Sequence, residues 1–149
     1  MPAIDPARLI GDLKTLRRFG AFKTGVHRPS LSPQDMEARR WFVERAREAG
    51  LDARIDGIGS VFAFDPRPGG RRLLTGSHLE SQNEAGWLDG ALGVIYGLEA
   101  ARALREAGHE GRIDVAAWFD EEGHWGSFLG SKSYLGVLTQ DDIDAARNR

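Results

Sequence analysis

Residues 73–80 read LLTGSHLE and residues 113–123 read IDVAAWFDEEG. Each segment begins with a short apolar run typical of a β-strand and continues into acidic or imidazole side chains. Between them, residues 91–107 carry apolar side chains over an arc wide enough for a well-covered helix, which Gly108 ends. Strand, helix and strand in this order predict a right-handed crossover between two parallel strands. We expect residues 73–77 to form a more buried strand than those that precede it in the chain, with His78 at its carboxyl end.

The rest of the chain predicts helices and a hairpin around this crossover. Periodic apolar side chains between capping residues predict four more helices, which cover residues 6–20, 33–50, 127–135 and a segment that begins at Thr139. Residues 51–64 contain two short strand patterns separated by a glycine-rich turn, which predicts a β-hairpin. Residues 21–31 are expected to be a loop. The predicted fold class is therefore α/β, with a mixed sheet flanked by helices.

Composition excludes several classes of partner. The chain has 149 residues, of which 41% are hydrophobic, and its net charge is -2. Nothing in that balance favours nucleic acid or an anionic membrane. No apolar run is long enough to span a bilayer, and the first residues have no secretory pattern. There is no cysteine, so disulfides and thiolate ligands are excluded, and we expect a cytoplasmic protein.

Acidic and imidazole side chains gather where ligands bind in sheets of this kind, beyond the carboxyl ends of the strands. His78 follows the first strand of the crossover, and the pair Glu121-Glu122 follows the second. Asp89 lies just before the connecting helix. Such ligands without thiolate suit catalytic zinc, or manganese or cobalt, and a carboxylate can bridge two ions. Of two adjacent acids, one can bind metal while the other accepts a proton from water.

Each of these residues also has a structural interpretation. A lone histidine after a strand is more often a hydrogen-bonded structural residue than a ligand. An Asp-Gly pair such as Asp89-Gly90 is usually a turn, and adjacent acids such as Glu121-Glu122 usually form a solvated loop. Their common placement at strand ends is what favours a metal site.

Three ordered motifs carry a resemblance to a known family. Residues 75–81 (TGSHLES), 88–94 (LDGALGV) and 119–123 (FDEEG) resemble the family of N-carbamoyl-L-amino-acid amidohydrolases and allantoate amidohydrolases. This family belongs to the dinuclear-zinc aminoacylase/carboxypeptidase superfamily, whose catalytic domain has a zinc-dependent exopeptidase-like fold. The resemblance covers essentially the whole chain. It implies hydrolysis of a linear carbamoyl, ureido or amidine-type carbon–nitrogen bond in a small-molecule substrate.

The resemblance also implies a role for each site residue. His78 would bind the first metal ion, Asp89 would bridge both ions and Glu122 would bind the second. Glu121 would be the general base that activates water. Glu80 stands where the family usually has aspartate, and it would hold the imidazole of His78 from outside the metal ligands.

The family pattern extends beyond this sequence. Two further metal-binding histidines, a substrate-binding arginine and a lid domain that forms the homodimer would all follow Arg149. Residues 1–149 are therefore expected to form a single, incomplete metallohydrolase catalytic domain from a truncated or split protein, without the lid or dimerisation domain. Two ions would each have two protein ligands here, whereas catalytic zinc normally has three. A C-terminal complementing chain would supply the rest, and His124 is the only local substitute.

Two other functions remain open on the sequence. The same superfamily contains aminoacylases and dipeptidases, and the motifs do not select the scissile bond. The chain could instead be a non-catalytic remnant or a binding module that kept the fold.

Overall fold

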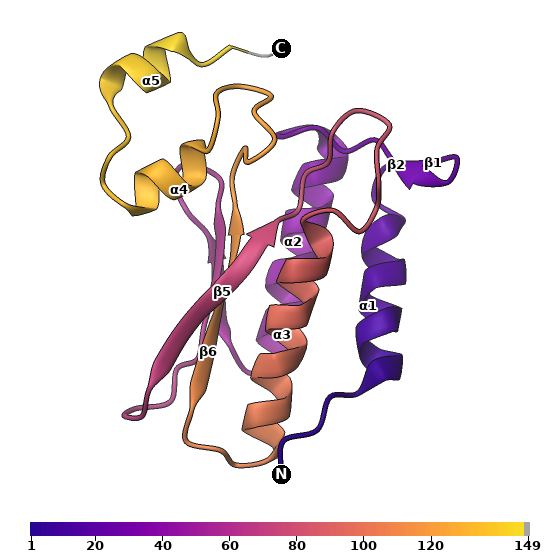
Figure 1. Ribbon diagram of the computed structural model, residues 1–149, viewed down its shortest axis with the longest axis vertical. Helices are drawn as coiled ribbons and strands as arrows, with labels where there is room; N and C mark the ends of the chain where they lie inside the picture. Colours follow the sequence, from indigo (N-terminus) through magenta and orange to yellow (C-terminus); the bar gives the residue numbers. More distant parts are fainter. Residues whose placement is uncertain (148–149) are drawn as a thin grey trace.

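A computed structural model describes residues 1–147, and its centre is a four-stranded sheet in the order β3-β4-β6-β5 (Figure 1). The strands are β3 (Asp52–Ile55), β4 (Val61–Phe64), β5 (Arg72–His78) and β6 (Arg112–Trp118). β5 and β6 run parallel, whereas β4 is antiparallel to both β6 and β3. The hairpin, the parallel crossover and the mixed sheet that the sequence predicts are therefore confirmed.

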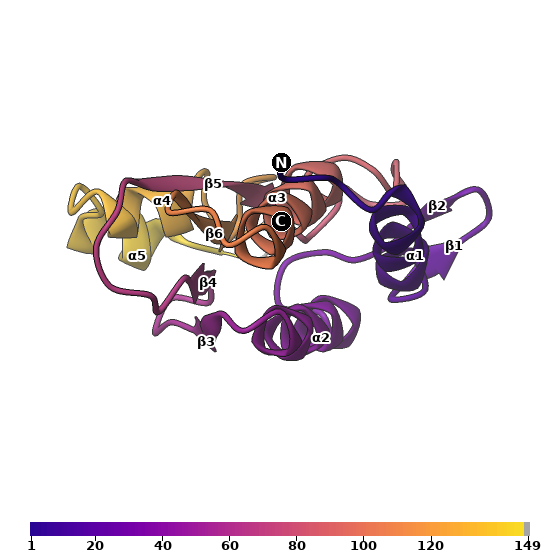
Figure 2. The same cartoon turned by 90° about the horizontal axis from the view of Figure 1, so that it is seen from below.

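Two long helices cover one face of the sheet. α3 (Ala91–Glu106) connects β5 to β6 and packs on both strands, and α2 (Pro33–Glu48) packs on β3 and β4 (Figure 2). α3 can approach closely because its surface toward the strands has no side chain at Gly97. A Cβ atom there would lie 3.0 Å from Thr75 Cγ2 and 3.1 Å from Val115 Cγ1.

A third helix, α1 (Pro6–Arg17), lies outside these two and packs on α3 (Figure 2). Its first turn is capped by Asp5, whose carboxylate accepts hydrogen bonds from the backbone N–H groups of Ala7 and Arg8. α1 ends three residues before the predicted stop at Gly20. The core between the sheet and these helices consists of fully or nearly fully buried side chains, among them Leu16, Phe42, Ala46, Val61, Leu79, Val94, Ile95, Leu98 and Val115.

Two short helices, α4 (Leu129–Tyr134) and α5 (Gln140–Ala145), lie on the other side of the sheet from α2 and α3 (Figure 2). Tyr134 of α4 packs on the aromatic rings of Phe62 and Trp118, with ring centroids 5.5 and 5.2 Å away. α5 begins with a capping box between Thr139 and Asp142, as the sequence predicts for its start. The two termini of the described chain lie at opposite ends of the molecule (Figure 1).

Residues 21–31, which are predicted to be a loop, contain regular secondary structure. Within them, β1 (Ala21–Phe22) and β2 (Gly25–Val26) form a small hairpin. Val26 then exchanges two backbone hydrogen bonds with Ala85, at 2.9 and 3.0 Å. This bridge attaches the loop between β5 and α3 to the N-terminal part of the chain.

The expectation that residues 73–77 form a more buried strand than the preceding ones is wrong, since β4 is more buried than β5. Within the described residues β5 pairs only with β6, so it is an edge strand, and its Leu73 is 60% exposed. An apolar start to a strand does not reveal how many neighbours the strand will have. None of the helices in residues 1–147 combines the length and apolar character needed to cross a membrane.

Candidate metal centre

His78 is the last residue of β5, and its imidazole orientation is set on two sides. Its Nδ1 lies 2.9 Å from the backbone carbonyl oxygen of Glu80. Its ring packs against Gly90, where a Cβ atom would lie 2.4 Å from His78 Cε1. Gly90 also has φ +67°, a left-handed conformation that favours glycine. The side chain is nearly buried, and its Nε2 points toward the acidic residues that follow β6.

Three donor groups converge at this strand end. His78, Glu121 and Glu122 each offer a ligand atom, and these atoms lie within 4.8 Å of one another. Glu121 Oε2 lies 3.4 Å from His78 Nε2, whereas Asp89 Oδ1 lies 4.0 Å away. The Asp89 side chain is 72% exposed and that of Glu121 is 36% exposed. The structure thus brings His78 and both glutamates together, with Asp89 at the margin of the cluster.

Gln82 orients the second glutamate. Its Nε2 donates to Glu122 Oε2 at 2.8 Å and also lies 3.2 Å from the backbone oxygen of Glu122. One carboxylate oxygen of Glu122 is therefore already hydrogen-bonded, which restricts its side-chain rotation. The amide connects the loop after β5 to the loop after β6.

Glu80 is fully buried beneath this cluster, in a network of charged groups. Its Oε2 accepts a hydrogen bond from Arg39 Nη2 at 2.7 Å, and its Oε1 accepts one from the backbone N–H of Glu121 at 2.6 Å. Arg39 is also fully buried and donates to Asp35 at 2.9 Å. Burial raises the pKa of the Glu80 carboxyl above its ordinary value, although the positive charge of Arg39 opposes this rise. The backbone oxygen of Glu80 contacts the imidazole, whereas its carboxylate positions the loop that carries Glu121.

Arg28 supports the same loops from the N-terminal side. Its guanidinium is buried and donates to the backbone oxygens of Leu79, Leu16 and Phe19 at 2.7, 2.9 and 2.8 Å. Burial lowers the pKa of Arg28 to about 10, although the negative charge of Glu80 is among the groups that oppose this change. The backbone that directly follows His78 is thus held by a charged group from a distant part of the chain.

The other histidines lie outside the cluster. His124 is buried, with Nδ1 3.3 Å from Ser30 Oγ and 3.9 Å from Asp120 Oδ1. Its Nε2 is buried without a hydrogen-bond partner among the described residues. His109 accepts a hydrogen bond from the backbone N–H of Gly111 at 2.9 Å. His27 and His124 line a separate pocket of about 350 Å³.

Several residues that build the site were not among the predicted site residues, namely Arg28, Arg39, Gln82 and Gly90. The sequence pattern does indicate that Arg39 is buried, because Asp35 and Arg39 fall on the same helical stripe as Phe42 and Ala46. Two opposite charges in an otherwise apolar stripe indicate a buried ion pair. Gln82 had no comparable signal, since its partner lies forty positions away.

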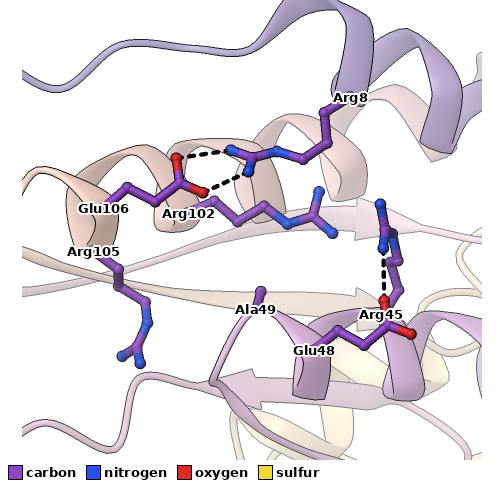
Figure 3. Close-up of a pocket in the computed structure, with 7 residues that line it drawn as sticks. All are labelled: Arg8, Arg45, Glu48, Ala49, Arg102, Arg105 and Glu106. Carbon is purple, nitrogen blue, oxygen red and sulfur yellow. Dashed lines mark hydrogen bonds and ion pairs between the residues drawn. The ribbon is translucent and has the colours of Figure 1, made fainter.

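A second concentration of charge lies at the other end of the helical layer. A pocket of about 410 Å³ is lined by side chains from α1, α2 and α3, including four arginines (Figure 3). Arg8 there pairs with Glu106 and with Glu99 beneath it, while Arg102 donates to Asp12 at 2.6 Å. Because carboxylates neutralise these guanidinium groups, the cluster joins the three helices and does not form an anion site.

The donor set at the strand ends suits a divalent cation. One imidazole and two carboxylates are ligands that zinc, manganese and cobalt accept, and zinc sites built this way are typical of catalytic centres. His78 is oriented by the backbone oxygen of Glu80 and Glu122 by Gln82, as metal ligands commonly are oriented by their neighbours.

A model of peptidase family M28 matches residues 61–148, more than half of the chain. The chain belongs to this family. An N-carbamoyl-L-amino-acid amidohydrolase from a Pseudomonas species is 33% identical over 147 residues, and the match covers 94% of this chain and 36% of that protein. An allantoate deiminase from Arabidopsis thaliana is 33% identical over 141 residues, with 87% and 26% covered.

The same fold appears in a crystal structure of an amidase of the hydantoinase/carbamoylase family from Burkholderia phymatum. It is 57% identical, with a TM-score of 0.95, and the match covers all of this chain and 37% of that one. The resemblance to carbamoylases and allantoate amidohydrolases drawn from the motifs is therefore confirmed. The chain spans about a third of the length of the curated relatives it matches.

Proposed function

We propose that this chain supplies the N-terminal part of the active site of a divalent-metal-dependent amidohydrolase that hydrolyses linear carbamoyl or ureido carbon–nitrogen bonds. One observation carries the proposal. The imidazole of His78 and the carboxylates of Glu121 and Glu122 converge where two parallel strands end. The names of its relatives, an amidohydrolase of N-carbamoyl amino acids and an allantoate deiminase, support the bond class.

In the complete site we propose His78, Asp89 and Glu122 as metal ligands and Glu121 as the general base. Zinc is favoured, with manganese or cobalt as alternatives, and two ions would be held. A bound divalent cation polarises the scissile carbonyl and makes water more acidic. Asp89 is exposed enough to reach a second ion, and Glu80 fixes the loop that carries Glu121.

Glu121 would move the proton in the reaction. Its carboxylate is partly exposed, so it can accept a proton from water while the water oxygen bonds to the carbonyl carbon. The same proton then passes to the nitrogen as the carbon–nitrogen bond breaks. With an N-carbamoyl amino acid, this step releases the amino acid with a neutral amino group together with carbamic acid, and the carbamic acid proton then passes to the amine to leave carbamate and an ammonium group.

Additional ligands are part of this proposal. Two ions held by His78, Asp89 and Glu122 alone would have two protein ligands each, and a catalytic zinc normally has three. We therefore propose that a further polypeptide, continuous with this chain or separate from it, completes the site and the substrate pocket. A homodimer, as in the family, would form through that additional part.

The test is reconstitution. The chain is co-expressed with the part of the Burkholderia phymatum amidase that it does not cover, and hydrolysis of N-carbamoyl amino acids and allantoate is measured. We expect turnover that a chelator abolishes and zinc restores. Glu121→Gln should lower kcat by about 10²- to 10⁴-fold, the usual contribution of a general base. Glu84→Gln, an exposed acid outside the cluster, is the control. Turnover that survives metal removal would contradict the proposal.

The match to a peptidase family favours one second candidate, hydrolysis of a peptide or N-acyl bond. Dipeptides and N-acetyl amino acids belong in the same substrate panel. A higher kcat/KM on dipeptides than on carbamoyl substrates would select this candidate. A folded, assembled protein that binds no metal and turns over no substrate would instead indicate a non-catalytic remnant or binding module.

A further inference from the structure

Arg39 of α2 reaches the loops of the candidate site from the helical layer. The residue is fully buried, and each of its three guanidinium nitrogens donates to a different acceptor. Nε donates to Asp35 at 2.9 Å, Nη1 to the backbone oxygen of Gly59 at 2.7 Å and Nη2 to Glu80 Oε2 at 2.7 Å. Because the guanidinium group is planar and rigid, these three contacts fix its position. Arg39 therefore connects α2 to the turn between β3 and β4 and to the loop after β5.

Glu80 contacts both sides of the candidate site. Its backbone oxygen lies 2.9 Å from His78 Nδ1, and its Oε1 accepts a hydrogen bond of 2.6 Å from the backbone N–H of Glu121. Its other carboxylate oxygen, Oε2, is the one that Arg39 holds. Rotation of this side chain would break at least one charge-assisted hydrogen bond. Glu80, held by Arg39, thus sets the backbone of Glu121 relative to the imidazole.

A second contact of Arg39 reaches the end of β6. Its guanidinium carbon lies 5.7 Å from the ring centroid of Phe119, within the range of a cation–π interaction. The same ring packs on the turn that Arg39 holds, since a Cβ atom at Gly59 would lie 3.1 Å from Phe119 Cδ2. Phe119 precedes Glu121 by two residues. The backbone that carries Glu121 is therefore fixed both at a side chain and at an N–H group, and both contacts depend on Arg39.

This arrangement matters for a proton acceptor. The Glu121 carboxylate is 36% exposed, so its position depends largely on the backbone that carries it. A general base must lie within hydrogen-bond reach of the proton that it accepts, and a displacement of about 1 Å can cost about 10²-fold in rate. We infer that Arg39 is a positioning residue for the general base. It fixes the backbone of Glu121 through Glu80 and Phe119, without touching the reacting atoms. The inference rests on the proposed function, in which Glu121 accepts the proton.

Backbone amide hydrogen exchange, measured by NMR on the chain itself, tests the positioning directly. Arg39→Met should speed exchange of the Glu121 N–H by at least about tenfold, the factor expected when a hydrogen bond to a charged group is weakened. The N–H of Gly126 is the internal control, because Asp120 accepts its hydrogen bond at 2.7 Å independently of Arg39. Its exchange should change much less. If Arg39→Met does not fold, Arg39→Lys and Glu80→Gln give the same comparison, since neither keeps all of the original hydrogen bonds.

The reconstituted enzyme tests the consequence for catalysis. At saturating zinc, Arg39→Met should lower kcat by about 10- to 100-fold, the usual cost of losing a group that orients a functional residue. KM should stay nearly unchanged, because the loss affects the proton transfer and not substrate binding. Arg102→Met is the matched control. It breaks another buried ion pair, with Asp12 at the contact of α1 and α3, and should leave kcat nearly unchanged.

Two results would overturn the inference. Equal exchange of the Glu121 N–H in Arg39→Met and Arg102→Met would show that Arg39 does not hold this loop. Faster exchange with an unchanged kcat would show that proton transfer does not depend on the position that Arg39 sets. A reconstituted wild-type enzyme without activity would instead contradict the proposed function and remove the role of base from Glu121. The exchange measurement decides separately whether Arg39 holds its backbone.

Discussion

At the scale of single residues, Gly90 determines where the imidazole can lie. Its φ of +67° is strained for any other residue, and the space for a Cβ atom is filled by the ring of His78. Gly90 also precedes α3, so one residue connects the start of a helix with the orientation of a candidate ligand.

Gly90→Ala should therefore displace His78. We expect a loss of stability of about 1–3 kcal/mol, typical of a non-glycine residue held in a sparsely populated conformation, together with a loss of zinc affinity. Gly86→Ala is the matched control, because this glycine lies in the same loop with no atom near its Cβ position. Equal zinc affinity in the two variants would show that Gly90 does not position the imidazole.

Arg39 is a second single residue on which the stability of the fold depends strongly. It is fully buried between Asp35 and Glu80, so its removal leaves two carboxylates without their cation. Arg39→Met should lower the free energy of unfolding by about 3–5 kcal/mol, the cost of breaking a buried ion pair. Arg40→Met, on the exposed side of the same helix, should change it by less than about 0.5 kcal/mol. Urea unfolding of the two variants measures the difference, and similar values would rule out a structural role for the Arg39 network.

At the scale of elements, α1 is joined to α3 by a buried carboxylate. Glu99 is fully buried and accepts hydrogen bonds from Arg8 at 2.8 Å and from the backbone N–H of Asp5 at 2.9 Å. Burial raises the pKa of Glu99, but these hydrogen bonds and the charges of Arg8 and Arg102 outweigh it and hold the pKa below its ordinary value. The folded protein therefore holds this proton less tightly than the unfolded chain does.

The sign of this shift predicts a pH dependence. The contribution of Glu99 to stability is complete above its ordinary pKa of 4.5 and is lost as the pH falls through the lower pKa of the folded state. At pH 7, Glu99→Gln should cost about 2 kcal/mol, as expected for hydrogen bonds to a charged group. The gap to wild type should narrow below about pH 4.5. Denaturant unfolding from pH 3 to 7 tests this, with exposed Glu37→Gln as control, and a constant gap would contradict it.

At the scale of the whole molecule, the sheet ends at an exposed edge. Within residues 1–147, β5 has one strand neighbour, and its backbone groups on the other side lack a strand partner. Its side chains include Leu73, which is 60% exposed. An unpaired apolar edge strand is a template for pairing with another chain.

We therefore expect the isolated chain to self-associate as its concentration rises. Leu73→Lys should shift the population toward monomer, because a charge on an edge strand opposes edge-to-edge pairing. Leu135→Lys removes an exposed leucine of similar accessibility away from this edge and should have a smaller effect. Sedimentation velocity over a range of concentrations measures both, and equal association of wild type and Leu73→Lys would exclude the β5 edge as the contact.

Much of the fold could be predicted because its signals are local. The caps Asp5, Ser32 and Thr139 act within one helical turn, and the periods of apolar side chains follow from helix and strand geometry. The imidazole and carboxylate residues at the strand ends could be identified from the sequence equally well. A parallel crossover brings its two carboxyl ends to one edge, so His78 and Glu121 could be expected to be neighbours or nearly so, and the direct pairing of β5 with β6 makes them neighbours.

By itself, the sequence determined the α/β class, the crossover and the residues that gather at its carboxyl end. Only the tertiary structure decided that the Glu80 carboxylate binds Arg39 and the Glu121 backbone, that Asp89 lies at the margin and that β5 is an edge strand. The physical reason for this division is how far apart in the sequence the interacting residues lie. Caps and periodicity depend on residues a few positions apart, whereas carboxylate direction and strand neighbours depend on partners about forty positions away, which no local pattern specifies.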